Sequence, residues 1–309
     1  MKKIGLALGS GSAKGLAHIG VLKVLDEEKI PIDFIAGTSI GALIGVVYAS
    51  GVSTGEMEEI ALNIDKKQIT SFFTPTIPYS GLVEGKRITE FIKSIIGNPN
   101  IEDLKIPFAA IATNVLNGRK VMITKGSAVE AVRASISIPG IFTPCKHNGD
   151  FLVDGGLVDP VPVNCVRDMG ADYIIGVNVV PLPEKKTNKL MMKGEEKKLA
   201  TVPVNSKLVN TRLSKFIKPV KSVMQNPFLT LTGKLKTMRE SPSIFTIILQ
   251  TIAIMEQQII NLQLKNLGPD ILIEPDVGFI KPLEFYRSKE AIAVGERAAR
   301  DSLGNVEQK

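Results

Sequence analysis

Residues 32–49 read IDFIAGTSIGALIGVVYA, and this stretch decides the fold class. A strand-like run at its start leads through the turn Gly37-Thr38-Ser39-Ile40-Gly41 into a helical pattern that continues to Ala49. A G-x-S-x-G turn in this context is typical of a nucleophile elbow, because its glycines permit a sharp turn above the sheet. The Ser39 hydroxyl would then lie near a helix amino terminus, whose dipole favours developing negative charge. A plain glycine-rich strand-to-helix turn is the alternative interpretation.

A second glycine-rich turn, GSGSAKG at residues 9–15, joins a strand-like run to a helical pattern nearer the amino terminus. Neighbouring parallel strands would bring this turn and Ser39 to one sheet edge, where the backbone N–H groups of Gly11 and Ser12 could hold an oxyanion. A dinucleotide-binding turn fits less well, since Lys14 occupies the third glycine position and Gly15 comes one residue late. Lys14 would either attract a phosphate-bearing substrate or lie solvated on the first helical turn.

A serine nucleophile needs a base, and the chain contains two histidines, His18 and His147. The position of His18 is more typical of a packing residue on the first helix, and His147 lies in a hydrophilic stretch that resembles a surface turn. Asp154 instead follows the strand-like run Phe151–Val153, so it is the candidate base. A carboxylate of ordinary pKa is a weak base towards serine, so the site must orient the pair closely and exclude competing water.

Strand-like and helical segments alternate over the first 180 residues, which predicts an α/β fold with a mostly parallel sheet and helices on both faces. Strands are expected at Lys3–Leu8, Ile32–Ala36, Pro107–Ala112, Lys120–Thr124, Phe151–Val153, Tyr173–Val179 and Ile271–Ile273. Helices are expected over Ala13–Lys29, Ile40–Ala49, Ser53 to about Asp65, Lys86–Ile96, Pro162–Gly170, Ser243–Lys265 and Ser288–Leu303. In the helix Ser243–Lys265 the core-facing side is expected to carry Ile244, Ile248, Ile252, Met255, Ile259 and Leu262.

The net charge of +7 is concentrated in one segment of the 309-residue chain. Between Glu184 and Glu240, fourteen lysines and arginines stand against four glutamates. We therefore expect one domain over residues 1–309 with a basic insertion or lid at about 181–240. This insertion is either a solvated loop, a packed lid, or a basic amphipathic segment that contacts an anionic membrane surface. Nucleic acid is not an expected partner, because the segment has two Phe and the chain has no Trp.

Composition narrows the class of protein further. Hydrophobic residues make up 44% and charged residues 22%, which is typical of a globular chain and not of a disordered or fibrous one. The longest apolar stretch, Ile244–Met255, is too short to cross a bilayer. Two cysteines fit a reducing compartment, and no Cys/His group has metal-ligand spacing, so we expect no metal and no cofactor. The expected location is the cytoplasm, and contact of the basic insertion with an anionic membrane would place the protein at the inner face of the membrane.

Four motifs together resemble the patatin-like phospholipase family, in the order that the family has them. The motifs are the glycine-rich oxyanion block Gly9–Gly15, the elbow Gly37–Gly41, the Ser/Pro block Ala134–Gly140, and the Asp motif Asp154-Gly155-Gly156. The chain closely resembles the bacterial single-domain branch, which is similar to the esterase domain of neuropathy target esterase. One departure is that Ser10 and Ser12 stand where the family commonly has glycines.

The resemblance implies a patatin-like three-layer sandwich with a Ser39–Asp154 dyad and an oxyanion hole at Gly11 and Ser12. Its implied activity is hydrolysis of phospholipid, lysophospholipid or related acyl esters through an acyl-enzyme, without a metal. Within the Ser/Pro block, Ser135 and Ser137 look like structural or substrate-loop residues. A non-catalytic lipid-binding or regulatory protein that retains the fold is the alternative. The sequence predicts no oligomeric state.

Overall fold

The computed structural model describes residues 2–73, 83–180, 244–266 and 268–304. Internal contacts divide the chain into two units, one of Met1–Leu182 with Phe245–Lys309 and the other of Pro183–Ile244. The basic insertion expected at about 181–240 lies outside the described residues, so the fold below is that of the first unit.

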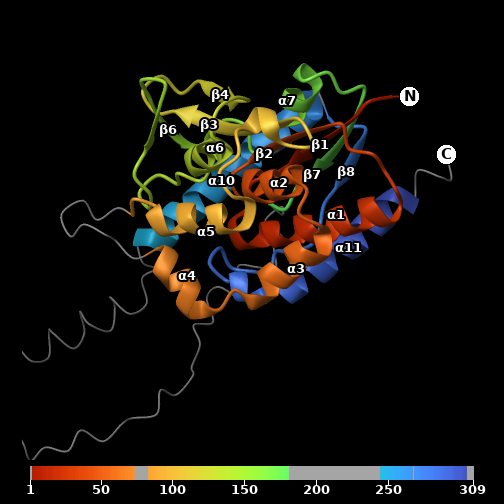
Figure 1. The fold of residues 1–309 in the computed structure, drawn as a ribbon, viewed down its shortest axis with the longest axis horizontal. Coiled ribbons are helices and arrows are strands. Elements are labelled where there is room, and N and C mark those ends of the chain that lie inside the picture. The colour runs from red at the N-terminus through yellow and green to blue at the C-terminus, as the bar shows by residue number, and fades with distance from the viewer. Residues whose placement is uncertain (1, 74–82, 181–243, 267, 305–309) are drawn as a thin grey trace, which may run out of the picture. The chain divides into compact units, whose positions relative to one another are not determined.

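One eight-stranded sheet forms the centre of this unit (Figure 1). Each strand is hydrogen-bonded to the next along the path β5-β6-β3-β2-β1-β7-β8, and β4 also pairs with β3. The strands are β1 (Ile4–Leu8), β2 (Phe34–Thr38), β3 (Phe108–Asn114), β4 (Lys120–Ile123), β5 (Cys145–His147), β6 (Asp150–Asp154), β7 (Tyr173–Val177) and β8 (Ile271–Ile273). From β8 through β7, β1 and β2 to β3 all pairs are parallel, which confirms the expected mostly parallel sheet. At the other end of the sheet, β3 pairs antiparallel with β4 and β6, and β5 pairs antiparallel with β6.

Helices cover both faces of the sheet, as the alternating pattern predicts (Figure 1). The helices are α1 (Ala17–Glu27), α2 (Ile40–Ser50), α3 (Thr54–Asn63), α4 (Lys66–Phe72), α5 (Lys86–Ile96), α6 (Ala128–Ser135), α7 (Val163–Asp168), α10 (Ile244–Asn266) and α11 (Ser288–Gly304), with short 3-10 turns at Ser12–Leu16, Ile101–Asp103, Gly155–Leu157 and Phe285–Arg287. Successive side chains of a strand point to opposite faces. Leu6 and Leu8 of β1 therefore pack in the cluster that contains α1, α2 and α11, while Ala7 packs in the cluster that contains α7 and Ile260 of α10.

Local sequence signals explain where several helices begin and end. The expected capping box is present at α3, where Ser53 and Glu56 bond reciprocally across the first turn. Gly97 ends α5 with φ 73° and ψ −139°, a backbone conformation that residues with side chains rarely adopt and that suits glycine. The sequence reading missed α4, whose amino terminus is capped by Asp65.

The buried side of α10 differs from the expected one. Met255 and Leu262, expected in the core, are 47% and 65% exposed. The helix instead buries Leu249 and Ile260 together with two polar residues, Glu256 and Gln257. A stripe of regularly spaced apolar residues therefore predicted the helix but not its orientation, because polar side chains face the interior here.

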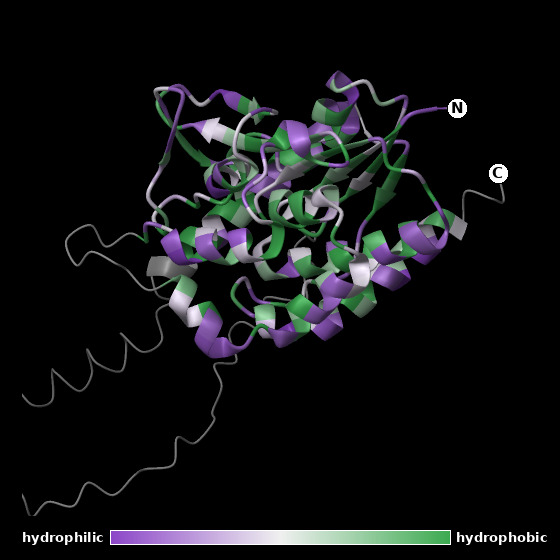
Figure 2. Ribbon diagram, viewed as in Figure 1, coloured by the Kyte–Doolittle hydropathy of each residue, from purple (hydrophilic) through white to green (hydrophobic). Residues whose placement is uncertain are grey.

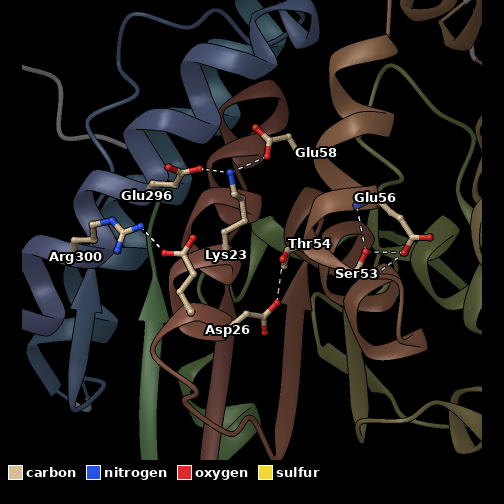
Figure 3. A network of polar contacts seen from close by, with 9 residues as sticks. Lys23, Asp26, Ser53, Thr54, Glu56, Glu58, Glu296 and Arg300 are labelled. Carbon is tan, nitrogen blue, oxygen red and sulfur yellow. Dashed lines mark hydrogen bonds and ion pairs between the residues drawn. The ribbon is translucent and has the colours of Figure 1, made fainter.

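Polar contacts join the outer helices α1, α3 and α11 (Figure 3). Lys23 of α1 lies between Glu58 of α3, at 2.7 Å, and Glu296 of α11. Arg300 of α11 pairs with Glu27, at the carboxyl end of α1, at 2.5 Å. These pairs are partly exposed, so each adds at most about 1 kcal/mol to stability.

Apolar burial contributes most of the stability of this unit instead. Figure 2 shows hydrophobic residues along the central strands and mixed residues on α3 and α11. Within the described residues, no helix has the length and apolar character needed to cross a membrane.

Candidate active site

Strand β3 positions the serine and the aspartate of the candidate site. Along one of its edges β3 pairs first with β2, ending at Thr38 opposite Ile111, and then with β6, ending at Asp154 opposite Ala112. Strand β4 overlaps both of these stretches and therefore occupies the other edge of β3. Because β2 runs parallel and β6 antiparallel to β3, the carboxyl ends of β2 and β6 meet head to head. Ser39 and Asp154 are thus brought together by adjacent positions on one strand.

The turn that carries Ser39 has the strained geometry expected of an elbow. Ser39 has φ 56° and ψ −121°, outside the regions that residues with side chains favour, and it directly precedes α2. A Cβ on Gly37 would lie 2.4 Å from the carbonyl oxygen of Gly41, and one on Gly41 would lie 2.2 Å from that of Leu8. Both elbow glycines are therefore required by close backbone approach, which explains the G-x-S-x-G spacing.

The two predicted site side chains contact each other directly. Ser39 Oγ donates a hydrogen bond of 2.6 Å to Asp154 Oδ2, and both residues are buried. The other carboxylate oxygen, Oδ1, accepts a bond of 2.8 Å from the Gly156 N–H. Thr113 Oγ1 donates to the Asp154 carbonyl at 2.8 Å and fixes the backbone of the strand end. This geometry allows direct proton transfer from the serine hydroxyl to the carboxylate.

Burial changes the basicity of Asp154. It raises the pKa of this carboxyl to about 6, although the hydrogen bonds from Ser39 and Gly156 act in the opposite direction. Asp154 is therefore not a carboxylate of ordinary pKa. A pKa of about 6 leaves the group mostly ionised at pH 7 and makes it a better proton acceptor than an exposed aspartate.

The Ser/Pro block holds both members of the pair, which the sequence reading did not foresee in detail. Ser135, fully buried, accepts a bond of 2.9 Å from the Ser39 N–H and donates one of 2.6 Å to the Ile111 carbonyl. The carbonyl of Ser137 accepts from the Asp154 N–H at 3.0 Å. Arg133, also buried, donates to Ser137 Oγ at 2.5 Å. The block therefore acts as a support for the elbow and for the strand end, in line with the structural role expected for Ser135 and Ser137.

The Gly9–Gly15 turn presents two backbone donors. The N–H groups of Gly9 and Ser10 donate to the carbonyls of Val177 and Pro160. Those of Gly11 and Ser12 donate no hydrogen bond within the part of the chain that the structure describes. Ser12 has φ 52°, a left-handed conformation that costs a serine about 1 kcal/mol relative to glycine. The substitution of serine for glycine thus stores strain but keeps the N–H.

Lys14 and the two histidines have distinct surroundings. Lys14 is half-buried beside Glu256, and burial lowers its pKa, so it is not the fully solvated lysine of one interpretation. His18 is buried with Nε2 at 2.8 Å from the Gly9 carbonyl, and desolvation lowers its pKa to about 4, so it is a neutral packing residue. His147 is the last residue of β5 and lies directly before the exposed turn Asn148-Gly149 that leads into β6, so the hydrophilic stretch forms the expected surface turn, and the hydrogen bond of His147 is to Asn148. Neither histidine bonds to Ser39.

Glu256 is a residue of this site that the sequence reading missed. It projects from α10 towards the Asp154–Gly156 turn and is 7% exposed. The only sequence signal was a charged residue between Ile252 and Ile259 in an apolar helical stripe. Among the described residues, no group of three or more His, Cys, Asp or Glu side chains is arranged to hold a metal ion.

The fold and the serine–carboxylate pair define a three-layer α/β protein whose elbow serine bonds to a buried aspartate. Residues 6–165, which include Ser39 and Asp154, match the family model described as patatin-like phospholipase. The chain belongs to the patatin-like phospholipase family.

Three curated relatives show how far the similarity extends. An uncharacterised NTE family protein of Mycobacterium tuberculosis is 38% identical over 177 residues, which are 57% of this chain and 49% of that protein. Lysophospholipase NTE1 of Coccidioides immitis is 37% identical over 181 residues, 58% of this chain and 12% of that protein. Another uncharacterised NTE family protein, of Mycobacterium bovis, is 29% identical over 308 residues, 98% of this chain and 46% of that protein. The chain thus spans less than half the length of each.

A solved structure also aligns with the fold. The crystal structure of VipD from Legionella pneumophila matches with a TM-score of 0.40 and 15% identity, covering 62% of this chain and 52% of that chain.

Proposed function

We propose that this chain is a serine hydrolase of lipid acyl esters, of the phospholipase A or lysophospholipase kind, in which Ser39 is the nucleophile and Asp154 the base. The observation that carries the proposal is the 2.6 Å hydrogen bond between these two buried side chains at a strained elbow. Membership of a phospholipase family and the similarity to a protein named lysophospholipase favour a lipid substrate.

The proposed reaction follows from the positions of these groups. Ser39 Oγ bonds to the ester carbonyl carbon as its proton passes to Asp154 Oδ2, and the carbonyl oxygen becomes an oxyanion. The N–H groups of Gly11 and Ser12 would hold this oxyanion. Collapse of the intermediate expels the alcohol, which takes the proton from Asp154 and leaves an acyl-enzyme. Asp154 then accepts a proton from water as the water attacks, and Ser39 recovers its proton when the fatty acid leaves.

The second candidate is a lipid-binding or regulatory protein that keeps the fold without turnover. The observation that favours it is the strained serine at position 12 of the oxyanion block. A panel of short acyl esters, lysophospholipids and diacyl phospholipids separates the two, with the Ser39→Ala protein as background. We expect release of fatty acid from at least one lipid substrate by the wild-type chain alone. Lipid binding with no release from any substrate would favour the second candidate.

We also propose peripheral contact with an anionic membrane through the basic segment, which would place the protein at the inner face of the membrane in the cytoplasm. The proposal is supported by the fourteen basic and four acidic residues between Glu184 and Glu240. Sedimentation with vesicles should require anionic lipid and weaken as salt is raised from 0.05 to about 0.5 M, because salt screens these charges. Equal binding to neutral vesicles would contradict the role of the lysines.

A further inference from the structure

The carboxyl group of Glu256 lies against the same turn that positions Asp154. A Cβ built on Gly156 would lie 2.1 Å from Glu256 Oε1 and 3.2 Å from Asp154 Oδ1. The two carboxyl groups therefore flank one α-carbon, that of the residue whose N–H bonds to Asp154. Because Glu256 fills this space, no residue with a side chain fits at position 156 without displacing it.

Among the residues that the structure describes, three groups face Glu256 from the elements packed against α10. Asp154 at the end of β6 is the neighbouring acid, and Lys14 in the turn before α1 is the neighbouring cation. The buried Ser10 hydroxyl lies next to the carboxyl without a well-aligned hydrogen bond. The site thus holds two acids and one base in a desolvated space, where a full set of charges is costly.

We propose that Glu256 is a positioning residue of the hydrolytic site, which supports the Asp154–Gly156 turn as a neutral carboxylic acid and stops turnover when it ionises. This inference rests on the proposed function of Ser39 and Asp154. A neutral Glu256 leaves Asp154 as the one anion opposite Lys14. An ionised Glu256 adds a second negative charge beside the turn, repels Asp154 and opposes the oxyanion that must form at Gly11 and Ser12.

The order of ionisation follows from the surroundings. Burial raises the pKa of Glu256 to about 8, with the charge of Asp154 raising it further and Ser10 and Lys14 acting in the opposite direction. Asp154, with a pKa of about 6, therefore ionises first while Glu256 keeps its proton. Between these values the site has an ionised base and a neutral support, the state in which the proposed reaction runs.

The first test is the pH dependence of kcat/KM with p-nitrophenyl butyrate, after subtraction of the rate measured with Ser39→Ala. The wild-type value should rise through pH 6 as Asp154 ionises and fall above pH 8, so that the ratio of pH 9 to pH 7 is about 0.1. In Glu256→Gln the rise through pH 6 should remain and the ratio should be about 1. Glu256→Asp, which keeps a titrating group, should keep the alkaline fall. A wild-type fall that persists in Glu256→Gln would overturn the inference.

A second variant separates Glu256 from Lys14, whose deprotonation could also produce an alkaline fall. Lys14→Gln removes the positive charge that lowers the pKa of Glu256, so the fall should move to higher pH. If Lys14 itself were the titrating group, this variant would have no alkaline fall. Glu256→Gln would then move the fall to lower pH, because it removes the charge that raises the pKa of Lys14. The two assignments therefore differ in which variant loses the alkaline fall, Glu256→Gln or Lys14→Gln, and in the direction in which the fall moves in the other variant. Loss of the fall in Lys14→Gln, together with a fall at lower pH in Glu256→Gln, would contradict the role of Glu256.

Thermal unfolding tests the buried neutral acid without any measurement of activity. A carboxyl whose pKa is higher in the folded state stabilises the fold fully at low pH, and this contribution is lost as pH rises towards the folded value. Between pH 6.5 and 8, Asp154 is largely ionised in both states, and His18 is neutral in the folded state. Unfolded His18 still binds some protons near pH 6.5, and this small contribution opposes the fall in Tm, so Glu256 contributes most of the three to the pH dependence of Tm. The wild-type Tm should fall by at least about 3 °C across this range, and the Tm of Glu256→Gln should be nearly flat.

The two readouts distinguish the ways in which the proposals can fail. No turnover by the wild-type chain, together with the expected Tm shift, would refute the proposed function and leave Glu256 as a buried neutral acid. Turnover with an alkaline fall in both proteins, or a Tm that depends equally on pH in both, would refute the role of Glu256 and leave the proposed function intact.

Discussion

Ser39→Ala should lower the rate of acyl-ester hydrolysis by about 10³-fold or more. Among the described residues, the structure offers no other hydroxyl bonded to the carboxylate of Asp154 that could form the acyl-enzyme. The fold should persist, because alanine is only one oxygen atom smaller and occupies the same strained backbone. Initial rates with p-nitrophenyl butyrate and with the best lipid of the substrate panel measure the effect, and Tm checks the fold.

Ser50→Ala is the matched control for this variant. Ser50 ends the same helix that Ser39 precedes, and its hydroxyl bonds to the Val47 carbonyl at 2.7 Å, far along α2 from the elbow. This variant should hydrolyse the same esters at the wild-type rate. Turnover that survives in Ser39→Ala would remove Ser39 as the nucleophile, whatever the result with Ser50→Ala.

Asp154→Asn should lower kcat/KM by about 10²- to 10⁴-fold, the usual contribution of a general base. The amide can still accept the Gly156 N–H bond through its oxygen, but its nitrogen faces the Ser39 hydroxyl as a donor and takes up no proton. The Tm at pH 7 should be nearly unchanged or higher, because the variant removes a buried charge whose pKa burial raises to about 6.

Asp150→Asn provides the comparison at the other end of the same strand. Asp150 is exposed at the start of β6, so its variant should keep wild-type activity and stability. A rate near that of the wild type in Asp154→Asn would contradict the assignment of the base. A large fall in its Tm would show instead that the carboxylate mainly supports the fold.

The sequence was sufficient to predict the elements that build the elbow but not the arrangement that completes the site. The run before Ser39 and the glycines on either side of it are local signals, and the structure has the strand, turn and helix that they predict. The meeting of β2 and β6 along β3 depends on strand register over more than 100 residues of chain. No local pattern encodes such a register, so the motifs indicate that Ser39 and Asp154 pair, but the 2.6 Å contact depends on the fold.

Burial was the second property that the sequence could not supply. Glu256 lies four residues after Ile252 and three before Ile259 on α10, and the sequence pattern gives no sign that its carboxyl group is buried. The helix is turned so that Glu256 faces the site while Met255 is exposed, because the polar interior of the site accommodates a carboxyl group. The raised pKa of Asp154 has the same origin, since desolvation depends on the packing of several distant segments.

The most direct measurement of the central claim is the rate at which a fluorophosphonate probe labels the chain at pH 7, with the labelled residue located by mass spectrometry. We expect one label per chain, on Ser39, and labelling of Asp154→Asn that is about 100-fold slower or more, since the carboxylate no longer accepts the serine proton. A label on any other residue, or equal labelling rates in the two proteins, would contradict the claim that Asp154 activates Ser39.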